Sequence, residues 1–340
     1  MISCVDLFCG VGGLTHGLEK SGIAVRAGFD VDEDCRFAYE SNNESRFFCQ
    51  DVSSITGKEI RKHWKSGSVS LLAGCAPCQP FSSYSRASRK SKANEKWDLV
   101  SEFGRLVEVS SPNLVTMENV SQLAQHGVFQ EFLKSLRDYH VWYSIVECSE
   151  YGVPQSRKRL VLMASQFGPI ELPKRRPSRP ATVEKAIGHM PVLRAGELDS
   201  CDALHHACHL SPLNLKRIRA SQPGGTWREW PKSLLANCHR KDSGETYPSV
   251  YGRMEWDRPG PTITTQCFGY GNGRFGHPEQ DRAITLREAA MLQTFPRTYR
   301  FLPQGKKAVF HVLGRLIGNA VPVELARSIG RQFVKHVKNR

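Results

Sequence analysis

Short apolar runs alternate with segments of helical pattern through the first 165 residues, and this alternation restricts the fold more than any other feature. Helical apolar spacing is seen, for example, over Leu99–Val109. The apolar runs are Cys4–Phe8, Val69–Ala73, Leu114–Met117 and Leu160–Ala164. Strands that alternate with helices are typical of a parallel sheet with crossover connections. We therefore predict a doubly wound, Rossmann-like α/β domain over residues 1–168.

The composition and apolar pattern of the sequence change near Pro169. From there to about Thr262 it is irregular and rich in turn residues, and it begins with a run of Pro, Arg and Lys. After Thr285 helical apolar spacing returns, over Arg287–Leu292 and Val323–Val337. We expect a second, smaller domain over residues 169–275, and a hinge with C-terminal helices over 276–340 that return to the first domain.

The charge balance favours a polyanionic partner. Forty-seven Lys and Arg against 33 Asp and Glu leave a formal net charge of +14. Such a field attracts nucleic acid and accelerates its encounter with the protein. A basic enzyme unrelated to nucleic acid stays open on composition alone.

The cysteines and the apolar runs indicate where the protein acts. Eleven cysteines are scattered without a paired framework, which favours free thiols in a reducing compartment. The start, Met1–Phe8, lacks a basic segment, and no apolar run reaches the length of a membrane helix. We expect a cytoplasmic protein without a membrane partner.

A glycine-rich turn follows the first apolar run. Gly10, Gly12 and Gly13 lie between Cys4–Phe8 and the helical pattern of Leu14–Lys20. Glycine lets a ligand approach the backbone, and Asp30, near the end of the next apolar stretch, offers a carboxylate to a ribose diol. The full Gly-x-Gly-x-x-Gly pattern is absent, because Thr15 interrupts it. A single nucleoside therefore fits this turn better than a dinucleotide such as NAD, although a simple tight turn is an alternative.

A candidate nucleophile follows the strand Val69–Ala73. Cys78, in Pro77–Cys78–Gln79, is expected at the carboxyl edge of the sheet, where open α/β sheets bind ligands. A thiolate is the side chain best able to add to an electron-poor ring carbon. The alternative is a redox pair of Cys75 with Cys78, but the prolines around Cys78 disfavour it, and Cys75 is expected to be buried and inert.

Charged side chains from two other predicted strands should face this cysteine. Glu118 comes at the end of Leu114–Met117, whereas Arg157 and Arg159 lead into Leu160–Ala164. They suggest an acid and an arginine pair beside the nucleophile. A helix cap and a solvated basic turn are the alternatives.

The order of these motifs resembles the cytosine-C5 DNA methyltransferase family, from residue 4 to about 330. The motifs are Asp-Leu-Phe-Cys-Gly-x-Gly-Gly, Pro-Cys-Gln, Glu-Asn-Val, Gln-x-Arg-x-Arg and Gly-Asn-Ala-Val-Pro. The resemblance implies an S-adenosylmethionine-dependent methyltransferase domain with a target-recognition domain over 169–275. Its substrate would be double-stranded DNA, and a cytosine would be flipped out of the stack because its reacting atoms are inaccessible there.

The resemblance also implies residue roles. Cys78 would add to C6 of cytosine, Glu118 would act at N3, and Arg157 and Arg159 would hold the base and the acid. The cofactor pocket would be lined by Phe8, Gly10, Gly12, Gly13, Asp30, Asp51, Pro77, Leu99, Asn319 and Val321. The basic segment Ser82–Lys96 resembles the family's mobile DNA-contacting loop, but it has Ser83–Tyr84–Ser85 where many members have a glycine.

Several points stay open at this stage. Lys174, Arg175, Arg176, Lys216 and Arg217 are candidate phosphate ligands, but the recognised bases are not disclosed. The cluster from Cys201 to His209 matches no common zinc spacing, and no metal is expected.

A tRNA methyltransferase of the same family is disfavoured, because Cys267–Phe268–Gly269 replaces its Cys-Phe-Thr signature. A catalytically silent DNA-binding protein and an NAD oxidoreductase are further alternatives. We expect a monomer, with a cognate restriction endonuclease acting on the same site without a stable complex.

Overall fold

The fold is seen in a computed structural model that describes residues 1–77, 93–174, 180–241, 244 and 246–339. For residues 93–98 it describes the backbone only. The chain forms two compact units. The first unit comprises Met1–Tyr151, Lys158–Arg176 and Ala320–Arg340, and the second comprises Gly152–Arg157 and Pro177–Asn319. Residues 276–319 thus group with the second unit, and the return to the first begins at Ala320, later than residue 276.

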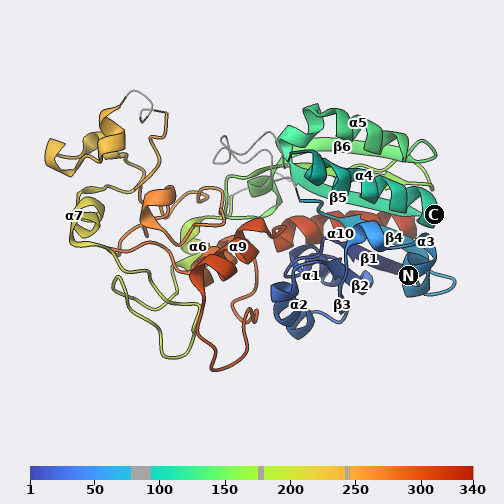
Figure 1. The fold of residues 1–340 in the computed structure, drawn as a ribbon, viewed down its shortest axis with the longest axis horizontal. Coiled ribbons are helices and arrows are strands. Elements are labelled where there is room, and N and C mark those ends of the chain that lie inside the picture. Colours follow the sequence, from blue (N-terminus) through green and yellow to red (C-terminus); the bar gives the residue numbers. More distant parts are fainter. Residues whose placement is uncertain (78–92, 175–179, 242–243, 245, 340) are drawn as a thin grey trace. The chain divides into compact units, whose positions relative to one another are not determined.

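The first unit is built on one seven-stranded sheet with the order β3-β2-β1-β4-β5-β7-β6 (Figure 1). Both chain termini belong to this unit. The strands are β1 (Ile2–Leu7), β2 (Ala24–Asp30), β3 (Arg46–Cys49), β4 (Val69–Gly74), β5 (Leu114–Val120), β6 (His140–Glu147) and β7 (Lys158–Ser165). Strands β1 to β5 are parallel, and the apolar runs predicted β1, β4 and β5 among them. The expectation of a wholly parallel sheet is wrong at one edge, because β7 runs antiparallel to both β5 and β6.

Helices pack on both faces of the sheet. The helices of this unit are α1 (Gly13–Glu19), α2 (Arg36–Asn42), α3 (Gly57–His63), α4 (Ala93–Ser110), α5 (Gly127–Lys134) and α10 (Val323–Lys338). Apolar side chains of α3, α4 and α5 share a buried cluster with Val5, Leu7 and other strand residues. Helix α10 packs against α1, as expected of the last helix, and Gly17 permits this contact because an added Cβ would collide with Val323 and Ala326. Burial of both sheet faces is what a doubly wound fold requires.

The second unit has little regular structure. Its helices are α6 (Val183–Ile187), α7 (Pro212–Ala220), α8 (Leu286–Leu292) and α9 (Phe310–Asn319). Aromatic rings and buried arginines hold its loops together, among them Arg253, which donates to the carbonyls of Ile218, Ser221 and His277. The turn-rich sequence after Pro169 is therefore matched by loops tied through side-chain bonds.

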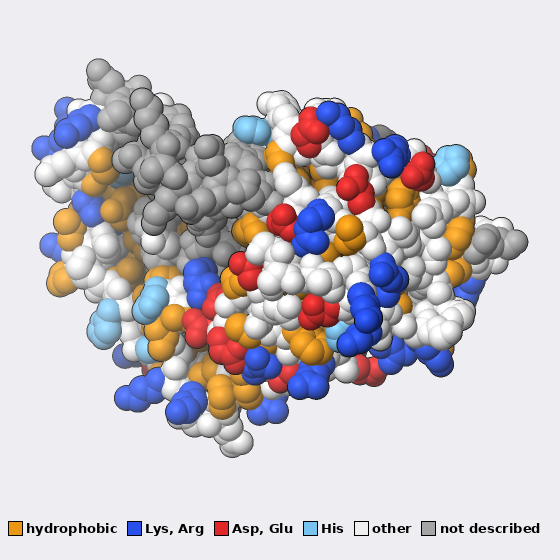
Figure 2. Space-filling model, turned by 45° about the vertical axis from the view of Figure 1, so that its right-hand side comes forward, with side chains coloured by type: hydrophobic (Ala, Val, Ile, Leu, Met, Phe, Trp, Pro, Cys, Tyr) orange, Lys and Arg blue, Asp and Glu red, His pale blue; other side chains and the backbone are white. Residues whose placement is uncertain are grey.

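The surface mixes charges of both signs. Figure 2 shows Lys and Arg side chains scattered among Asp and Glu over the face in view, so the charge excess of +14 is not gathered into one patch there. Among the helices of the described ranges, none has the length and apolar character of a membrane span.

Candidate functional site

The glycine-rich turn after β1 has an unusual backbone. Phe8, Gly10 and Gly12 have positive φ angles of 56°, 51° and 87°. A non-glycine residue such as Phe8 is strained in this region, and such strain persists where the surroundings enforce it. A Cβ added at Gly10 would meet no atom within 4 Å, so the backbone of this turn faces open space. A ligand can therefore approach the main chain closely here.

Asp30 lies beside this turn at the end of β2. Its Oδ2 accepts a hydrogen bond from the Gly10 amide at 2.9 Å, and its Oδ1 accepts one from the Asp32 amide at 2.9 Å. Burial raises the pKa of the Asp30 carboxyl, while these two backbone bonds oppose the shift. Each oxygen keeps a further lone pair, so the carboxylate can still accept a hydroxyl group of a ligand.

Val31 follows Asp30 and was not among the predicted site residues. Its side chain is 65% exposed, which is high for a large apolar residue, and it lies beside the half-buried carboxylate of Asp30. An apolar surface next to a hydroxyl-binding carboxylate can pack on an aromatic base. The only sequence signal for Val31 was its position directly after Asp30.

Asp51 follows β3 and caps a short 3-10 turn. Its Oδ1 accepts hydrogen bonds from the Ser53 amide and the Ser53 hydroxyl. This gives Asp51 a structural role in fixing the turn, and its exposed side chain keeps the second oxygen accessible to a ligand.

Glu118 and Arg159 meet at the carboxyl edge of the sheet. Arg159 Nε lies 3.1 Å from Glu118 Oε1, and the two side chains are 14% and 3% exposed. The antiparallel direction of β7 makes this contact possible, because the start of β7 then lies at the same edge as the end of β5. The predicted acid and one of its arginines are thus brought together.

Cys75 is the third member of this cluster. Its thiol donates a hydrogen bond to Glu118 Oε2 at 3.0 Å, and its side chain is half-buried. The expectation that Cys75 is buried is therefore wrong, because its side chain is half-buried and bonds to Glu118 of β5, while the expectation that it is inert stays a prediction. The carboxylate of Glu118 is held from two sides.

Asn119 connects the end of β5 to the segment before Cys78. Its side-chain amide donates to the Ala76 carbonyl at 2.9 Å and its Oδ1 accepts from the Val120 amide at 2.8 Å. Both groups are buried or nearly so, which makes the bonds costly to lose. Asn119 was quoted in a motif but given no role, so this positioning function was missed. Cys78 itself lies outside the described residues, as do most of Ser82–Lys96 and both Arg175 and Arg176.

Arg157 belongs to the second unit and has a different environment from Arg159. It is 3% exposed, and its guanidinium donates to the carbonyls of Ile263 at 3.0 Å and Gly318 at 3.4 Å. It also donates to the side-chain oxygen of Gln155 at 3.4 Å, so these bonds tie Arg157 to segments of its own unit.

Gln155 organises the same region and was not predicted as a site residue. Its amide nitrogen donates to the Leu292 carbonyl and to Gln293, while its oxygen accepts from the Ile263 amide at 2.8 Å. The side chain is fully buried. Three segments that are distant in the sequence therefore meet at one amide. The signal was present, since Gln155 opens the Gln-x-Arg-x-Arg motif.

The remaining predicted residues are placed as follows. Pro77 is exposed at the last described position before Cys78, Leu99 is half-buried in α4, and Val321 is buried ahead of α10. Asn319 ends α9 in the second unit.

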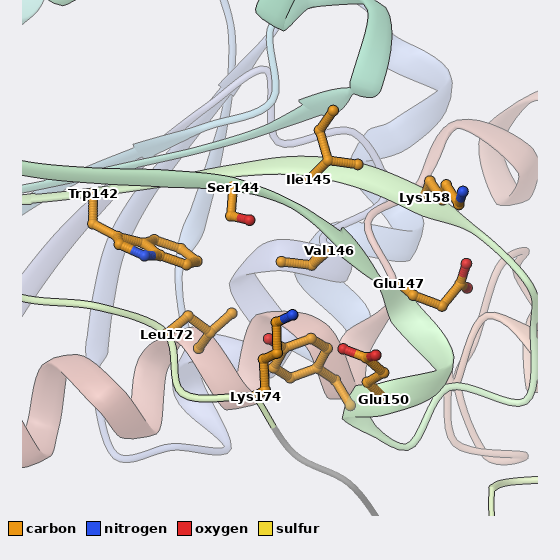
Figure 3. A pocket seen from close by; sticks show the side chains of 10 residues that line it. Trp142, Ser144, Ile145, Val146, Glu147, Glu150, Lys158, Leu172 and Lys174 are labelled. Carbon is orange, nitrogen blue, oxygen red and sulfur yellow. The ribbon is translucent and has the colours of Figure 1, made fainter.

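A metal-ligand cluster and a cavity are two further kinds of candidate site. Within the described residues no cluster of His, Cys, Asp and Glu is arranged for a metal ion, and His205 instead bonds Thr285 and the Pro191 carbonyl. A cavity of about 180 Å³ opens beside β6, with Trp142, Val146 and Glu150 among its lining residues (Figure 3). The candidate phosphate ligand Lys174 lines it, but none of the predicted catalytic or cofactor-binding residues does.

Comparison with known proteins gives a consistent result. The family model described as C-5 cytosine-specific DNA methylase matches residues 2–335. The Type II methylase M.HgiDII of Herpetosiphon aurantiacus is 49% identical, over 98% of this chain and 95% of that protein. The Type II methyltransferase M1.HphI of Haemophilus parahaemolyticus is 30% identical, over 98% and 87%.

A solved structure supports the fold. This is the crystal structure of a candidate DNA modification methyltransferase encoded within an E. coli prophage. The two chains are 21% identical and superpose with a TM-score of 0.74, over 99% of this chain and all of the other. The protein is an S-adenosylmethionine-dependent DNA (cytosine-5-)-methyltransferase. With the motifs in order, the glycine turn and the Glu118 cluster at the sheet edge, the chain belongs to the C-5 cytosine-specific DNA methylase family.

Proposed function

We propose that Cys78 forms a covalent bond to C6 of a flipped cytosine while Glu118 protonates or hydrogen-bonds N3. Addition of a thiolate to C6 places negative charge on the ring, and a group at N3 stabilises that charge. C5 thereby becomes nucleophilic. S-adenosylmethionine, when bound, supplies the methyl group that C5 accepts. Loss of the C5 proton and of Cys78 then restores the aromatic ring.

The observation that carries this proposal is the cluster of Arg159, Glu118 and Cys75. An acid buried to 97% is held between a guanidinium at 3.1 Å and a thiol at 3.0 Å, at the sheet edge that leads to Cys78. Arg159 fixes the position of the carboxylate and can donate its other N–H groups to the base. Arg157, through the Ile263 and Gly318 carbonyls, would position the segments around it.

The residues present at the turn after β1 fit a nucleoside cofactor. The open backbone at Gly10 provides the close approach, and Asp30 retains lone pairs for ribose hydroxyls. Val31 and Asp51 supply an apolar surface and an acceptor for the base. We assign the rest of the pocket to Phe8, Gly12, Gly13, Pro77, Leu99, Asn319 and Val321.

Residues 169–275, most of which belong to the second unit, are assigned to target recognition. Exposed basic side chains can clamp phosphates there while Asn, Gln and Arg read base edges. The similarity to Type II methylases supports a role in restriction-modification, with a cognate endonuclease that reads the same site. We propose that the enzyme acts as a cytoplasmic monomer, since one site needs one flipped base.

The test is incubation of the purified chain with tritiated S-adenosylmethionine and a plasmid of mixed sequence, followed by bisulfite sequencing. We expect 5-methylcytosine confined to one short motif, and none with Cys78→Ser. A tRNA pool runs in parallel, and label in tRNA instead of DNA would contradict the proposal. An active Cys78→Ser enzyme would refute the covalent mechanism.

A further inference from the structure

Asp6 is a buried carboxylate that the proposed mechanism does not use. It lies in β1 with 0% exposure. Val5 and Leu7 point into the apolar cluster beneath α3, α4 and α5, so the two-residue period of the strand turns Asp6 toward the opposite face. There its Oδ2 accepts a hydrogen bond from the Thr15 hydroxyl of α1 at 2.6 Å. The carboxylate therefore lies between β1 and α1, the two elements that the Gly10–Gly13 turn connects.

One oxygen of this carboxylate has no partner. Asp6 Oδ1 is buried and makes no hydrogen bond within the described residues. Thr15 is itself bonded to Tyr39, and Tyr39 to Ser45, so the polar network extends away from Oδ1. A buried acceptor without a donor is unfavourable, and more so when the group is charged. The ionised form of Asp6 is thus incompletely stabilised in the free protein.

The charges around Asp6 are of its own sign. Asp30 on β2 and Glu19 on α1 both act on it electrostatically, and in the described part of the chain no Lys, Arg or His forms an ion pair with it. The thiols of Cys4 and Cys9 and the hydroxyl of Tyr39 also face it, and burial raises the pKa of each, which keeps them neutral. Burial, with a smaller contribution from Asp30, raises the pKa of Asp6 to about 7. Near neutral pH the group therefore exchanges a proton readily.

We propose that Asp6 is a specificity residue, which ionises when the cationic methyl donor occupies the turn above it and so favours that donor over its neutral product. S-adenosylmethionine carries a sulfonium charge, whereas S-adenosylhomocysteine carries a neutral sulfur. A cation nearby supplies the favourable interaction that Oδ1 lacks, and the low dielectric of the site strengthens it. Binding of the donor then releases a proton, and methyl transfer removes the charge that kept Asp6 ionised. This inference rests on the proposed placement of the cofactor at Gly10–Gly13.

The test is titration calorimetry of the full chain with S-adenosylmethionine at pH 7, in two buffers that differ in ionisation enthalpy. If binding shifts Asp6 by one pKa unit, about 0.4 proton is released at pH 7, and the affinity rises about fivefold from pH 6 to pH 8. Asp6→Asn should lose both effects, because the amide keeps the shape but cannot ionise. Subtracting the proton release of Asp6→Asn from that of the wild type removes the contribution of the cofactor's own ionisable groups. With S-adenosylhomocysteine the wild type and Asp6→Asn should not differ.

Glu19→Gln is the matched control. The pKa of Glu19 is also raised to about 7, mainly by burial, but its carboxylate accepts from the Glu44 amide and belongs to the last residue of α1, at the end opposite to the turn. Because Glu19 also raises the pKa of Asp6, Glu19→Gln should move the proton release to slightly lower pH but keep it. Thr15→Val is a second probe, since loss of its hydroxyl bond should move the release to higher pH.

Equal proton release by the wild type and Asp6→Asn would overturn the inference and leave the proposed function intact. An equal Asp6-dependent release with S-adenosylhomocysteine would overturn it as well. Failure of the wild-type chain to bind S-adenosylmethionine would instead overturn the cofactor placement, and the inference with it.

Discussion

Arg159 and Glu118 form an ion pair across two antiparallel strands, with Nε 3.1 Å from Oε1. In the register of β5 and β7, Glu118 lies opposite Val161 and Arg159 lies opposite Val120, so the arginine reaches diagonally along one edge. Diagonal neighbours in a sheet are within reach of long side chains. The position of the proposed catalytic acid therefore depends on the direction of one strand.

Arg159→Ala should lower kcat/KM by about 100-fold or more, because it removes the cation that fixes Glu118, the proposed acid. Leaving Glu118 buried without this partner should also destabilise the chain by about 3 kcal/mol. Methyl transfer kinetics and urea unfolding measure the two effects. Arg137→Ala is the control, since Arg137 pairs with Asp138 at the surface, where both side chains are 81% exposed. Wild-type kcat/KM in Arg159→Ala would rule out the assigned role.

Asn119→Ala should slow catalysis without weakening cofactor binding. The Asn119 amide holds the Ala76 carbonyl two residues before Cys78. Displacement of a nucleophile by about 1 Å lowers the rate by about 100-fold. Trapping of the covalent complex on a duplex carrying 5-fluorocytosine would report the slower step. An unchanged rate of adduct formation would show that the Ala76 carbonyl needs no such anchor.

The sequence predicts the parallel half of the fold well and the antiparallel edge poorly. Apolar runs at β1, β4 and β5 are local signals, whereas strand direction depends on how the next connection crosses the sheet. The short link 148–157 between β6 and β7 did carry a hint, since a parallel crossover needs a dozen or more residues. The apolar run at Leu160–Ala164 fixed the existence of β7 but not its direction.

The sequence likewise predicts some residues of the candidate site and misses others. Glu118 and Asp30 were identifiable because each follows an apolar strand at the carboxyl edge. The role of Gln155 depends on residues over 100 positions away, at Ile263 and Gln293, and no local pattern encodes such partners. The expectation that Arg157 and Arg159 form a pair rested on their spacing, because residues two apart in a strand share a face. Arg157, however, precedes β7 and donates to the carbonyls of Ile263 and Gly318, whereas Arg159 within β7 forms an ion pair with Glu118.

Gln155→Ala should destabilise the second unit by about 3 kcal/mol, because it leaves the buried Ile263 amide and neighbouring groups without partners. Hydrogen exchange should show faster exchange at Ile263 and around Gln293. Gln166→Ala, at an exposed position with one 3.2 Å bond to Asn113, should stay within about 0.5 kcal/mol of wild type. Equal effects of the two substitutions would contradict a special role for the buried amide.

Gly28→Ala should destabilise the first unit by about 2 kcal/mol through overpacking. A Cβ at Gly28 would lie 2.8 Å from the Cys9 sulfur and closer still to the Tyr39 hydroxyl. Adding Tyr39→Phe removes that hydroxyl and should restore part of the loss in thermal unfolding. Gly127→Ala is the control, because its Cβ would meet nothing within 4 Å and it starts a helix. A double variant no more stable than Gly28→Ala would place the clash elsewhere.

The stability of the free protein should depend on pH through Asp6. Burial raises the pKa of Asp6 from 3.8 to about 7, so the folded chain prefers the protonated group. A raised carboxyl pKa contributes stability below about pH 4, and this contribution is lost as pH rises to about 7. Asp6→Asn cannot ionise, so its stability relative to wild type should increase between pH 5 and pH 8 by about 3 kcal/mol. Urea unfolding of the wild type and Asp6→Asn at several pH values measures this difference. If the stability difference between Asp6→Asn and wild type did not change with pH, the Asp6 carboxylate would remain ionised throughout this range. Its Oδ1 would then be stabilised by a partner such as bound water.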